Sequence, residues 1–255
     1  MKIIKVNSPG KEADELKNQD RLHTEIIENT LYAIVCDGVN SSSYSEQGAQ
    51  FAAENVKKLF QDDGIKWVVD KLENMRTELY NKPVLFPNGT IDAIKKIIEE
   101  VMQEKRKSAF QTTFIAVKAE ESKQVSAVGC GDSALFIFEP TGKLLHTNID
   151  VKNDLIHHTM SSTMVIPDCF VSASEALFRY ESNLADDAEI LLCSDGFYEC
   201  FDSVHDIVKW LYENQSALTA EDNQKLMETL HDKLNNKKGD DDISFIWLLP
   251  EQYNL

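Results

Sequence analysis

The chain has 255 residues, of which 42% are hydrophobic and 27% are charged, which is ordinary for a soluble globular protein. Its net charge of -17 disfavours a nucleic-acid partner, because phosphate contacts need clustered lysine and arginine side chains. No apolar run approaches the ~20 residues of a membrane helix, and the N-terminus has no apolar stretch long enough for a secretory signal. We therefore predict a cytoplasmic protein with no membrane partner.

The five cysteines point to the same compartment. Their number is odd and no two of them form a C-x-x-C pair, which fits a reducing environment and argues against a disulfide framework or a zinc ribbon. Cys36, Cys130 and Cys193 lie in apolar runs just before an aspartate, and we interpret them as small packing residues.

In the first part of the chain, the pattern of apolar residues predicts strands followed by helices. Alternating β-branched and apolar residues over 2–8 and 23–38 indicate strands. A helix with Ser45 as its N-cap is predicted over 45–61, and a helical period continues over 64–80. After a break at Pro83 and Pro87, the apolar residues of 90–107 recur every three or four positions, which predicts a strongly amphipathic helix.

Strands return in the second part, before two more helices and a last strand. Hairpins are predicted at the turns "EESK" and "PTGK", whereas the pattern over 149–184 is weak and predicts no definite element. The run "AEILLCSDG" is typical of a strand that is buried on both faces. The remaining predicted elements are strands over 112–120, 123–140, 142–148 and 240–250, and helices over 203–215 and 219–236.

This order is not the regular strand-helix alternation of a doubly wound fold. It predicts a single α+β domain over residues 1–255, with antiparallel sheets and helices packed outside them.

Several apolar runs end in an aspartate, which is costly to bury without a partner. Asp37-Gly38, Asp132 and Asp195-Gly196 each follow such a run, and Asp20 and the run 240–242 also lie beside predicted strands. Each motif alone is weak, because Asp-Gly is a common turn and an acidic run is often a solvated loop. Together they suggest that several strand ends meet around a hard cation such as Mg²⁺ or Mn²⁺, which prefers oxygen ligands.

The motifs also occur in a recognisable order along nearly the whole chain. They are "NQDR" (18–21), "YAIVCDGV" (32–39), "QTTFIAV" (111–117), "VGCGDSALFIF" (128–138), "ILLCSDGFYECF" (190–201) and "DDIS" (241–244). In this order the chain resembles the metal-dependent protein serine/threonine phosphatases of the PPM, or type 2C, family. The stretch "DGVNSSSYSEQGAQFAAENV" is most similar to a bacterial branch. The resemblance implies a four-layer α-β-β-α sandwich of two mainly antiparallel sheets flanked by helices.

The resemblance implies roles for individual residues. Asp37 would bridge two Mn²⁺ or Mg²⁺ ions, and the carbonyl of Gly38 would bind the second ion. Asp195 and Asp241 would bind the first ion, and Asp20 would hold a metal-bound water or the nucleophile. Asp132 would support the site from a neighbouring strand, and Thr112 and Thr113 would be core positions of the sheet.

The implied reaction is hydrolysis of phosphoserine or phosphothreonine on a protein by a metal-activated water, without a phosphoenzyme. The implied partners are a phosphorylated protein substrate and a cognate serine/threonine kinase, and we expect a monomer.

The chain departs from the family pattern at several positions. Gln19 replaces a glutamate, Glu15 stands where many members have a phosphate-binding arginine, and Val39 replaces a histidine found in some members. Lys17 or Arg21 could substitute for the arginine, although neither is at the matching position. No aspartate precedes Thr112 in "KRKSAFQTT", so a third ion lacks its ligand.

These departures keep two alternatives open. One is a phosphatase-like binding or regulatory module without turnover, although the retained Asp37, Asp195 and Asp241 favour an enzyme. The other is an unrelated metal hydrolase, which would need histidine ligands or a basic groove that the sequence does not show. The pair His157-His158 is interpreted as exposed and polar, with contact to the substrate as the alternative.

Overall fold

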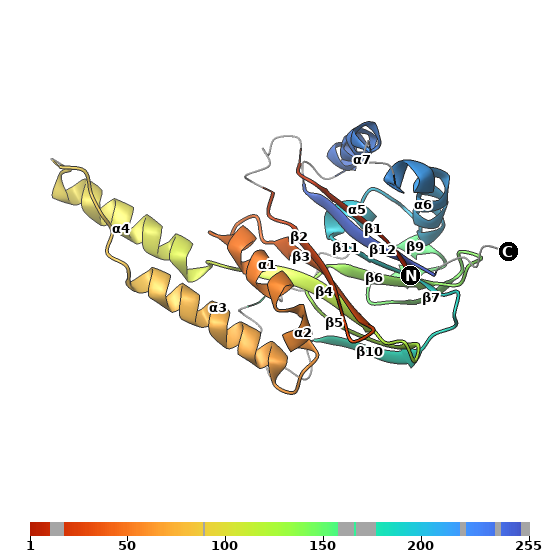
Figure 1. Ribbon diagram of the computed structural model, residues 1–255. Coiled ribbons are helices and arrows are strands. Elements are labelled where there is room, and N and C mark those ends of the chain that lie inside the picture. Colours follow the sequence, from red (N-terminus) through yellow and green to blue (C-terminus); the bar gives the residue numbers. More distant parts are fainter. Residues whose placement is uncertain are drawn as a thin grey trace.

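Two five-stranded antiparallel sheets form the centre of the molecule (Figure 1). The computed structural model describes residues 1–10, 18–88, 90–157, 166, 177–219, 223–237 and 241–250. The strands of the first sheet, in spatial order, are β10 (Phe178–Asn183), β5 (Gln124–Cys130), β4 (Thr112–Ala119), β3 (Thr30–Gly38) and β2 (Arg21–Ile27). Those of the second sheet are β1 (Lys2–Ser8), β12 (Ile243–Leu249), β11 (Glu189–Cys193), β6 (Ala134–Phe138) and β7 (Leu144–Thr147). A small separate hairpin joins β8 (Val151–Lys152) to β9 (Leu155–Ile156).

The central strands are apolar on both faces because each face meets a different layer. In β3, Leu31, Ala33 and Val35 join the core between the two sheets. The alternate residues Tyr32, Ile34 and Cys36 join a second core, under the helices that cover the first sheet. The predicted continuous burial of "EILLC" in β11 has the same cause and is confirmed, since all five of its residues are buried.

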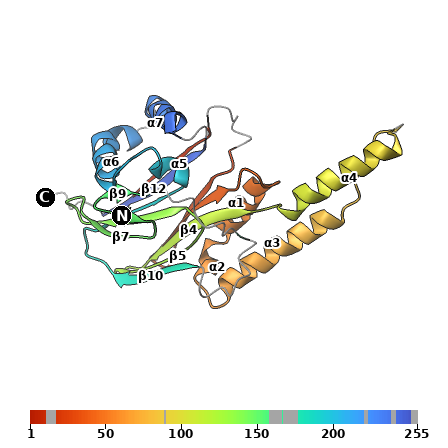
Figure 2. The same cartoon turned by 180° about the vertical axis from the view of Figure 1, so that it is seen from behind.

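Helices cover the outer face of each sheet, as Figures 1 and 2 show. α1 (Ser45–Glu54), α2 (Val56–Leu59) and α3 (Gly64–Asn81) pack on the first sheet. α5 (Asp195–Tyr198), α6 (Val204–Thr219) and α7 (Gln224–Lys237) pack on the second. The predicted four-layer sandwich of antiparallel sheets and flanking helices is therefore confirmed. None of the helices in the described ranges is long and apolar enough to cross a lipid bilayer.

The helix predicted over 45–61 differs from the structure at its start and at its middle. Tyr44, with a left-handed φ of 61°, is the N-cap residue, and the buried Ser45 hydroxyl is the first helical side chain and makes no capping bond. The prediction of Ser45 as N-cap is therefore wrong. The helix also breaks at Asn55, whose side-chain amide donates to the carbonyl of Phe51 at 2.8 Å and so competes with the helical backbone pattern.

Two further elements differ from the prediction. The strand predicted over 123–140 is two strands, β5 and β6, which lie in different sheets because the chain turns at Gly131 with φ 90°. The weakly patterned region contains β10, an edge strand whose side chains alternate between half-buried and exposed. That alternation, beginning at Phe178, was the signal from which this strand could have been predicted.

α4 (Asp92–Lys107) lies apart from the sandwich. It runs beyond the end of α3 and is accompanied there by the segment 82–88, as both views show (Figures 1 and 2). Only Arg106 of its 16 residues is buried. The predicted amphipathic helix is thus present, but much of its apolar surface is open to solvent.

Candidate metal centre

The antiparallel topology gathers aspartates from four strands at one edge of the sandwich. Asp37 lies at the end of β3, and Asp20 immediately precedes the neighbouring β2, whose Arg21 pairs with Cys36. In the second sheet, Asp195 follows β11, and Asp241 precedes the neighbouring β12, whose Phe245 pairs with Cys193. The end of one antiparallel strand lies beside the start of the next, so side chains far apart in the sequence meet here.

The four carboxyl groups interact electrostatically. Burial, followed by repulsion from Asp242, raises the pKa of Asp20 well above its ordinary value. Burial and the charge of Asp20 do the same for the pKa of Asp37. Burial and Asp241 raise the pKa of Asp195 to about 7, and burial is the main reason that the pKa of Asp241 rises to about 6. The edge therefore disfavours the ionised carboxylates unless positive charge is supplied.

Asp20 is the clearest example of a buried carboxylate without compensating groups. Its side chain is only 1% exposed, and neither carboxylate oxygen accepts a hydrogen bond within the described residues. The nearby Ser244 hydroxyl donates to Asn7 Oδ1 at 3.0 Å. The side-chain oxygen of Gln19 is likewise buried and without a donor. Three buried oxygens that lack donors fit a hard cation with its water ligands better than they fit a packed protein core.

The carboxylates are gathered without forming a ready-made chelate. Across the described ranges, no three histidine, cysteine, aspartate or glutamate side chains are placed closely enough to hold a metal ion as they stand. The Asp37 and Asp195 carboxyl groups still lie within hydrogen-bonding reach of each other, across the junction of the two sheets.

Hydrogen bonds fix the backbone around Asp37 and Asp195. Thr112 Oγ1 donates to the carbonyl of Asp37 at 2.7 Å, and Thr112 and Thr113 are both buried, as predicted for core positions of the sheet. Asp195 begins the short helix α5 and accepts a bond from the backbone N–H of Gly196 at 2.7 Å. A Cβ at Gly196 would lie 2.1 Å from the carbonyl oxygen of Asp242, so only glycine allows this approach of α5 to β12.

Asp242 was part of the acidic run noted in the sequence, but its role was not predicted. Its two carboxylate oxygens accept the backbone N–H groups of Gly10 at 2.8 Å and of Gln19 at 2.7 Å. One side chain at the start of β12 thereby holds the backbone on both sides of the segment 11–17. Because Gln19 immediately precedes Asp20, Asp242 also fixes the position of that buried carboxylate.

Two further acidic residues border the site. Asp132, in the turn between β5 and β6, raises the pKa of both Asp37 and Asp195, and its expected supporting role stays a prediction. Glu199 is 7% exposed and raises the pKa of Asp195 and Asp241. It was missed in the sequence, although it lies four residues after Asp195 and therefore one helical turn away.

Of the two side chains considered as substitutes for the missing arginine, Arg21 is engaged elsewhere. Its Nη1 donates to the carbonyls of Asn18 and Asp20, both at 2.7 Å, and so braces the backbone beside the site. Lys17 and Glu15 lie outside the described residues, as do Asp240, His158 and Cys169. His157 is exposed, as interpreted.

Comparison with known proteins gives the same overall picture. Solved structures similar to the chain include a point mutant of a bacterial serine phosphatase (TM-score 0.56, 18% identity, covering 98% of this chain and 99% of that one). They also include the serine/threonine phosphatase Stp1 from Staphylococcus aureus (TM-score 0.56, 16% identity, covering 99% and 96%) and RsbX in complex with magnesium (TM-score 0.51, 14% identity, covering 96% and 92%). At such identities the likeness concerns the fold. No curated protein sequence matches the chain.

The sequence itself matches a family profile, described as protein phosphatase 2C, over residues 9–234. The match includes Asp20, Asp37 and Asp195 and stops before Asp241. It extends over most of the sandwich, so the chain belongs to the protein phosphatase 2C family.

Proposed function

We propose that the protein hydrolyses phosphoserine and phosphothreonine esters on proteins at a centre of two Mn²⁺ or Mg²⁺ ions. The observation that carries the proposal is the acidic edge, where buried and half-buried carboxylates from both sheets have raised pKa values and where the Asp20 carboxylate accepts no hydrogen bond from the described residues. Membership of the protein phosphatase 2C family supports it, and the magnesium complex of the similar RsbX supports the choice of metal.

The proposed ligands divide between the sheets. Asp37 would bridge the two ions, with the backbone carbonyl of Gly38 on the second ion and Asp195 and Asp241 on the first. When bound, the ions would lower the pKa of a water molecule and offset charge on the phosphoryl oxygens. We infer no ligand for a third ion.

The chain's own residues would then orient the attacking water and hold its proton. Asp20, kept in place by the Asp242 clamp and braced by Arg21, would accept a hydrogen bond from the attacking water on the side away from the leaving group. Asp132 and Glu199 would add negative charge beyond the ligands and so strengthen retention of the cations. These side chains lie next to the ends of hydrogen-bonded strands and of α5, which favours fixed positions for water and phosphate.

The biological setting follows from the reaction. A phosphoprotein substrate implies a cognate serine/threonine kinase, and we propose that the chain acts as one catalytic domain in the cytoplasm. Cys36, Cys130, Cys193 and Cys200 are buried free thiols, which is consistent with a reducing compartment.

The test is the initial rate of hydrolysis of p-nitrophenyl phosphate and of a phosphothreonine peptide, with Mn²⁺, with Mg²⁺ and with EDTA. We expect metal-dependent turnover that is lost in EDTA and in Asp37→Ala and Asp195→Ala. Asp70→Asn, an exposed carboxylate on α3, is the matched control and should keep full activity. Undiminished activity in folded Asp37→Ala would refute the assignment of the bridging ligand.

A module without turnover is the second candidate. Two observations favour it: Gln19 brings no charge to the site, and Arg21 already binds backbone carbonyls. Metal binding and phosphopeptide binding without hydrolysis, in folded wild-type protein, would establish this candidate instead.

A further inference from the structure

The chain leaves β3 in a β-turn over residues 39–42, which places Asn40 beside the acidic edge. The Ser42 N–H donates to the Val39 carbonyl at 2.8 Å, and this bond closes the turn. Asn40 is exposed, and its Nδ2 lies 3.5 Å from Oδ1 of Asp241, which precedes β12 of the other sheet. The turn thus joins the end of one sheet to a proposed metal ligand at the start of a strand in the other.

Ser42 fixes this turn to the rest of the protein. It is only 6% exposed, and its hydroxyl donates to the Ser108 carbonyl and accepts the Gln111 N–H at 3.0 Å. The preceding bond joins the Val39 N–H to the Gln111 carbonyl at 3.1 Å. Ser42 therefore continues the hydrogen-bonded ladder of β3 and β4 by one further bond, so the turn is an extension of the sheet and not a free loop.

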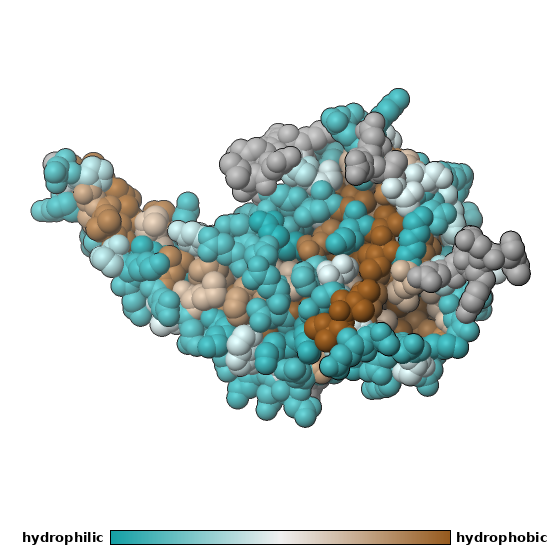
Figure 3. Space-filling view, in the orientation of Figure 1, coloured by the Kyte–Doolittle hydropathy of each residue, from teal (hydrophilic) through white to brown (hydrophobic). Residues whose placement is uncertain are grey.

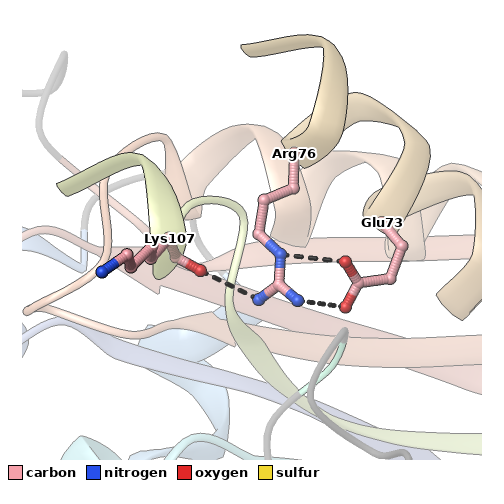
Figure 4. A network of polar contacts seen from close by, with 3 residues as sticks. All are labelled: Glu73, Arg76 and Lys107. Carbon is pink, nitrogen blue, oxygen red and sulfur yellow. Dashed lines mark hydrogen bonds and ion pairs between the residues drawn. The ribbon is translucent and has the colours of Figure 1, made fainter. Parts of the chain in front are cut away.

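The segment that Ser42 binds is also held from its other side. It follows α4, whose last residue, Lys107, accepts Nη1 of Arg76 on its carbonyl at 3.0 Å, and Arg76 also binds the Glu73 carboxylate (Figure 4). The projecting part of α4, along which Figure 3 shows hydrophobic surface, lies beyond this anchor and makes none of these bonds. The position of the turn therefore depends on the sandwich and on α3.

The metal centre lacks the arginine that many members of the family have for phosphate. Glu15 stands at that position, and Nη1 of Arg21 already donates to two backbone carbonyls. Among the described residues, Asn40 alone directs a non-carboxyl side-chain donor at one of the three proposed aspartate ligands, and that ligand is Asp241. An amide has two N–H groups, of which Asp241 accepts one, so the other can donate to a ligand that enters from solvent.

We propose that Asn40 contacts the substrate, and that its second amide N–H donates to a phosphoryl oxygen. This inference rests on the proposed function, since the metal centre would hold the phosphate. Because Asn40 is exposed beside a proposed ligand, a phosphate bound at the centre comes within its reach. A neutral amide is sufficient, since the ions would offset the charge of the phosphate and the amide adds a directed hydrogen bond. Ser42 is a positioning residue that acts through Asn40.

The test is the affinity of inorganic phosphate for the full chain at saturating Mn²⁺ or Mg²⁺, measured by calorimetry, which requires no turnover. Asn40→Ala should weaken phosphate binding about tenfold, the loss expected for one hydrogen bond to a charged group. It should raise the KM for a phosphothreonine peptide by a similar factor. The matched control is Ser41→Ala, the exposed neighbour in the same turn, which should leave both quantities unchanged.

Asn40→Asp separates contact with phosphate from support of Asp241. The two side chains have nearly the same shape, but an ionised aspartate donates no hydrogen bond and repels phosphate. We expect phosphate to bind at least about tenfold more weakly, and Mn²⁺ to bind at least as tightly as to the wild type, because the added charge attracts cations. A purely structural role would weaken metal binding and leave phosphate binding at saturating metal unchanged.

Ser42→Ala tests how Asn40 is positioned. We expect a loss of phosphate affinity close to that of Asn40→Ala. The double variant should bind phosphate no more weakly than Asn40→Ala alone, because both changes remove the same contact. Additive losses would show that Ser42 does not act through Asn40.

The wild type and the variants answer different questions. Hydrolysis by the wild type tests the proposed function, whereas the comparison of phosphate affinities tests Asn40, even in a protein that binds phosphate without turnover. Wild-type phosphate affinity in Asn40→Ala or Asn40→Asp at saturating metal would overturn the inference, as would an equal loss in Ser41→Ala. Folded wild-type protein that bound no phosphate with either ion would overturn both the inference and the proposed function.

Discussion

Replacing Asp195 by asparagine should change the stability of the protein in opposite directions without and with metal. In the metal-free protein, burial and the neighbouring Asp241 raise the pKa of Asp195 from 3.8 to about 7. At about 1.4 kcal/mol per pKa unit, ionising this group in the fold costs on the order of 4 kcal/mol relative to the unfolded chain. Asparagine removes the charge and can still accept the bond from the Gly196 N–H, which is 2.7 Å long.

The expected gain is smaller than the full cost, because Asp195 keeps some solvent exposure and asparagine must also be desolvated. We expect Asp195→Asn to stabilise the metal-free protein by about 2 kcal/mol at pH 7.5, or roughly 4–8 °C in Tm for a chain of this size. With metal the order reverses. A ligand at 100 times its Kd stabilises the wild type by about 2.7 kcal/mol, and the variant, lacking one ligand charge, should lose most of this increment.

The pH dependence has a defined sign. Since the folded-state pKa values of Asp195 and Asp241, about 7 and about 6, lie above the unfolded value, the folded protein binds more protons between pH ~4 and ~7. This stabilising contribution is complete below pH ~4 and is lost as the pH rises through that window. The pKa of Glu189 is also raised by burial and adds to the slope, so the difference between wild type and Asp195→Asn isolates the site.

The assay is thermal and urea denaturation from pH 4 to 8, in EDTA and with added Mn²⁺ or Mg²⁺. Asp70→Asn, which changes charge equally at an exposed position, should behave as the wild type throughout. If Asp195→Asn destabilised the metal-free protein at pH 7.5, or kept the full metal-induced increase in Tm, the electrostatic reasoning would be refuted.

Three further substitutions test the framework of the site. Gly196→Ala would place a methyl group 2.1 Å from the Asp242 carbonyl oxygen. We therefore expect the free energy of unfolding to fall by at least about 2 kcal/mol, measured by urea denaturation, and metal binding to weaken, measured by calorimetry. Unchanged metal affinity would refute the close approach. Asp242→Asn keeps only one acceptor for the Gly10 and Gln19 N–H groups, so it should lower the free energy of unfolding by about 1–3 kcal/mol. It should also lower kcat by a larger factor than it changes KM. Full activity would show that the clamp does not position Asp20. Phe197→Ala removes a fully buried ring that contacts Phe201, Trp210 and Phe245. It should lower the free energy of unfolding, measured by urea denaturation, by about 3–5 kcal/mol. A decrease of less than about 1 kcal/mol would contradict this packing.

The layered fold was predictable because its signals are local. Runs such as 190–193 are apolar at every position, which requires burial on both faces and hence a sheet between two layers. The hairpins at 120–123 and 139–143 carry their own turn residues. The sequence did not show that β5 and β6 belong to different sheets, because a single residue, Gly131, turns the chain between them.

The aspartates of the site were predictable as a set because each ends or begins an apolar strand. Their mutual placement depends on strand pairing, which is a property of the whole fold. The role of Asp242 could not be distinguished from that of its neighbours, since the sequence contains three consecutive aspartates and only tertiary structure shows which one accepts the Gly10 and Gln19 amides. The exposure of Ile94 and Ile97 was hidden for a related reason: a helical period shows an apolar face but not what covers it.

The acidic edge and the projecting helix can be tested as independent features. At the edge, buried oxygens such as those of Asp20 lack donors, and added positive charge should offset that cost. On α4, the side chains of Ile94, Ile97 and Val101 are about half exposed to solvent. The two share no residue, so their effects should be additive. We therefore expect Ile97→Glu to keep the full metal-induced increase in Tm. If Ile97→Glu reduced the metal-induced increase in Tm, α4 and the acidic edge would be energetically coupled, and α4 would then be a regulatory element of the site.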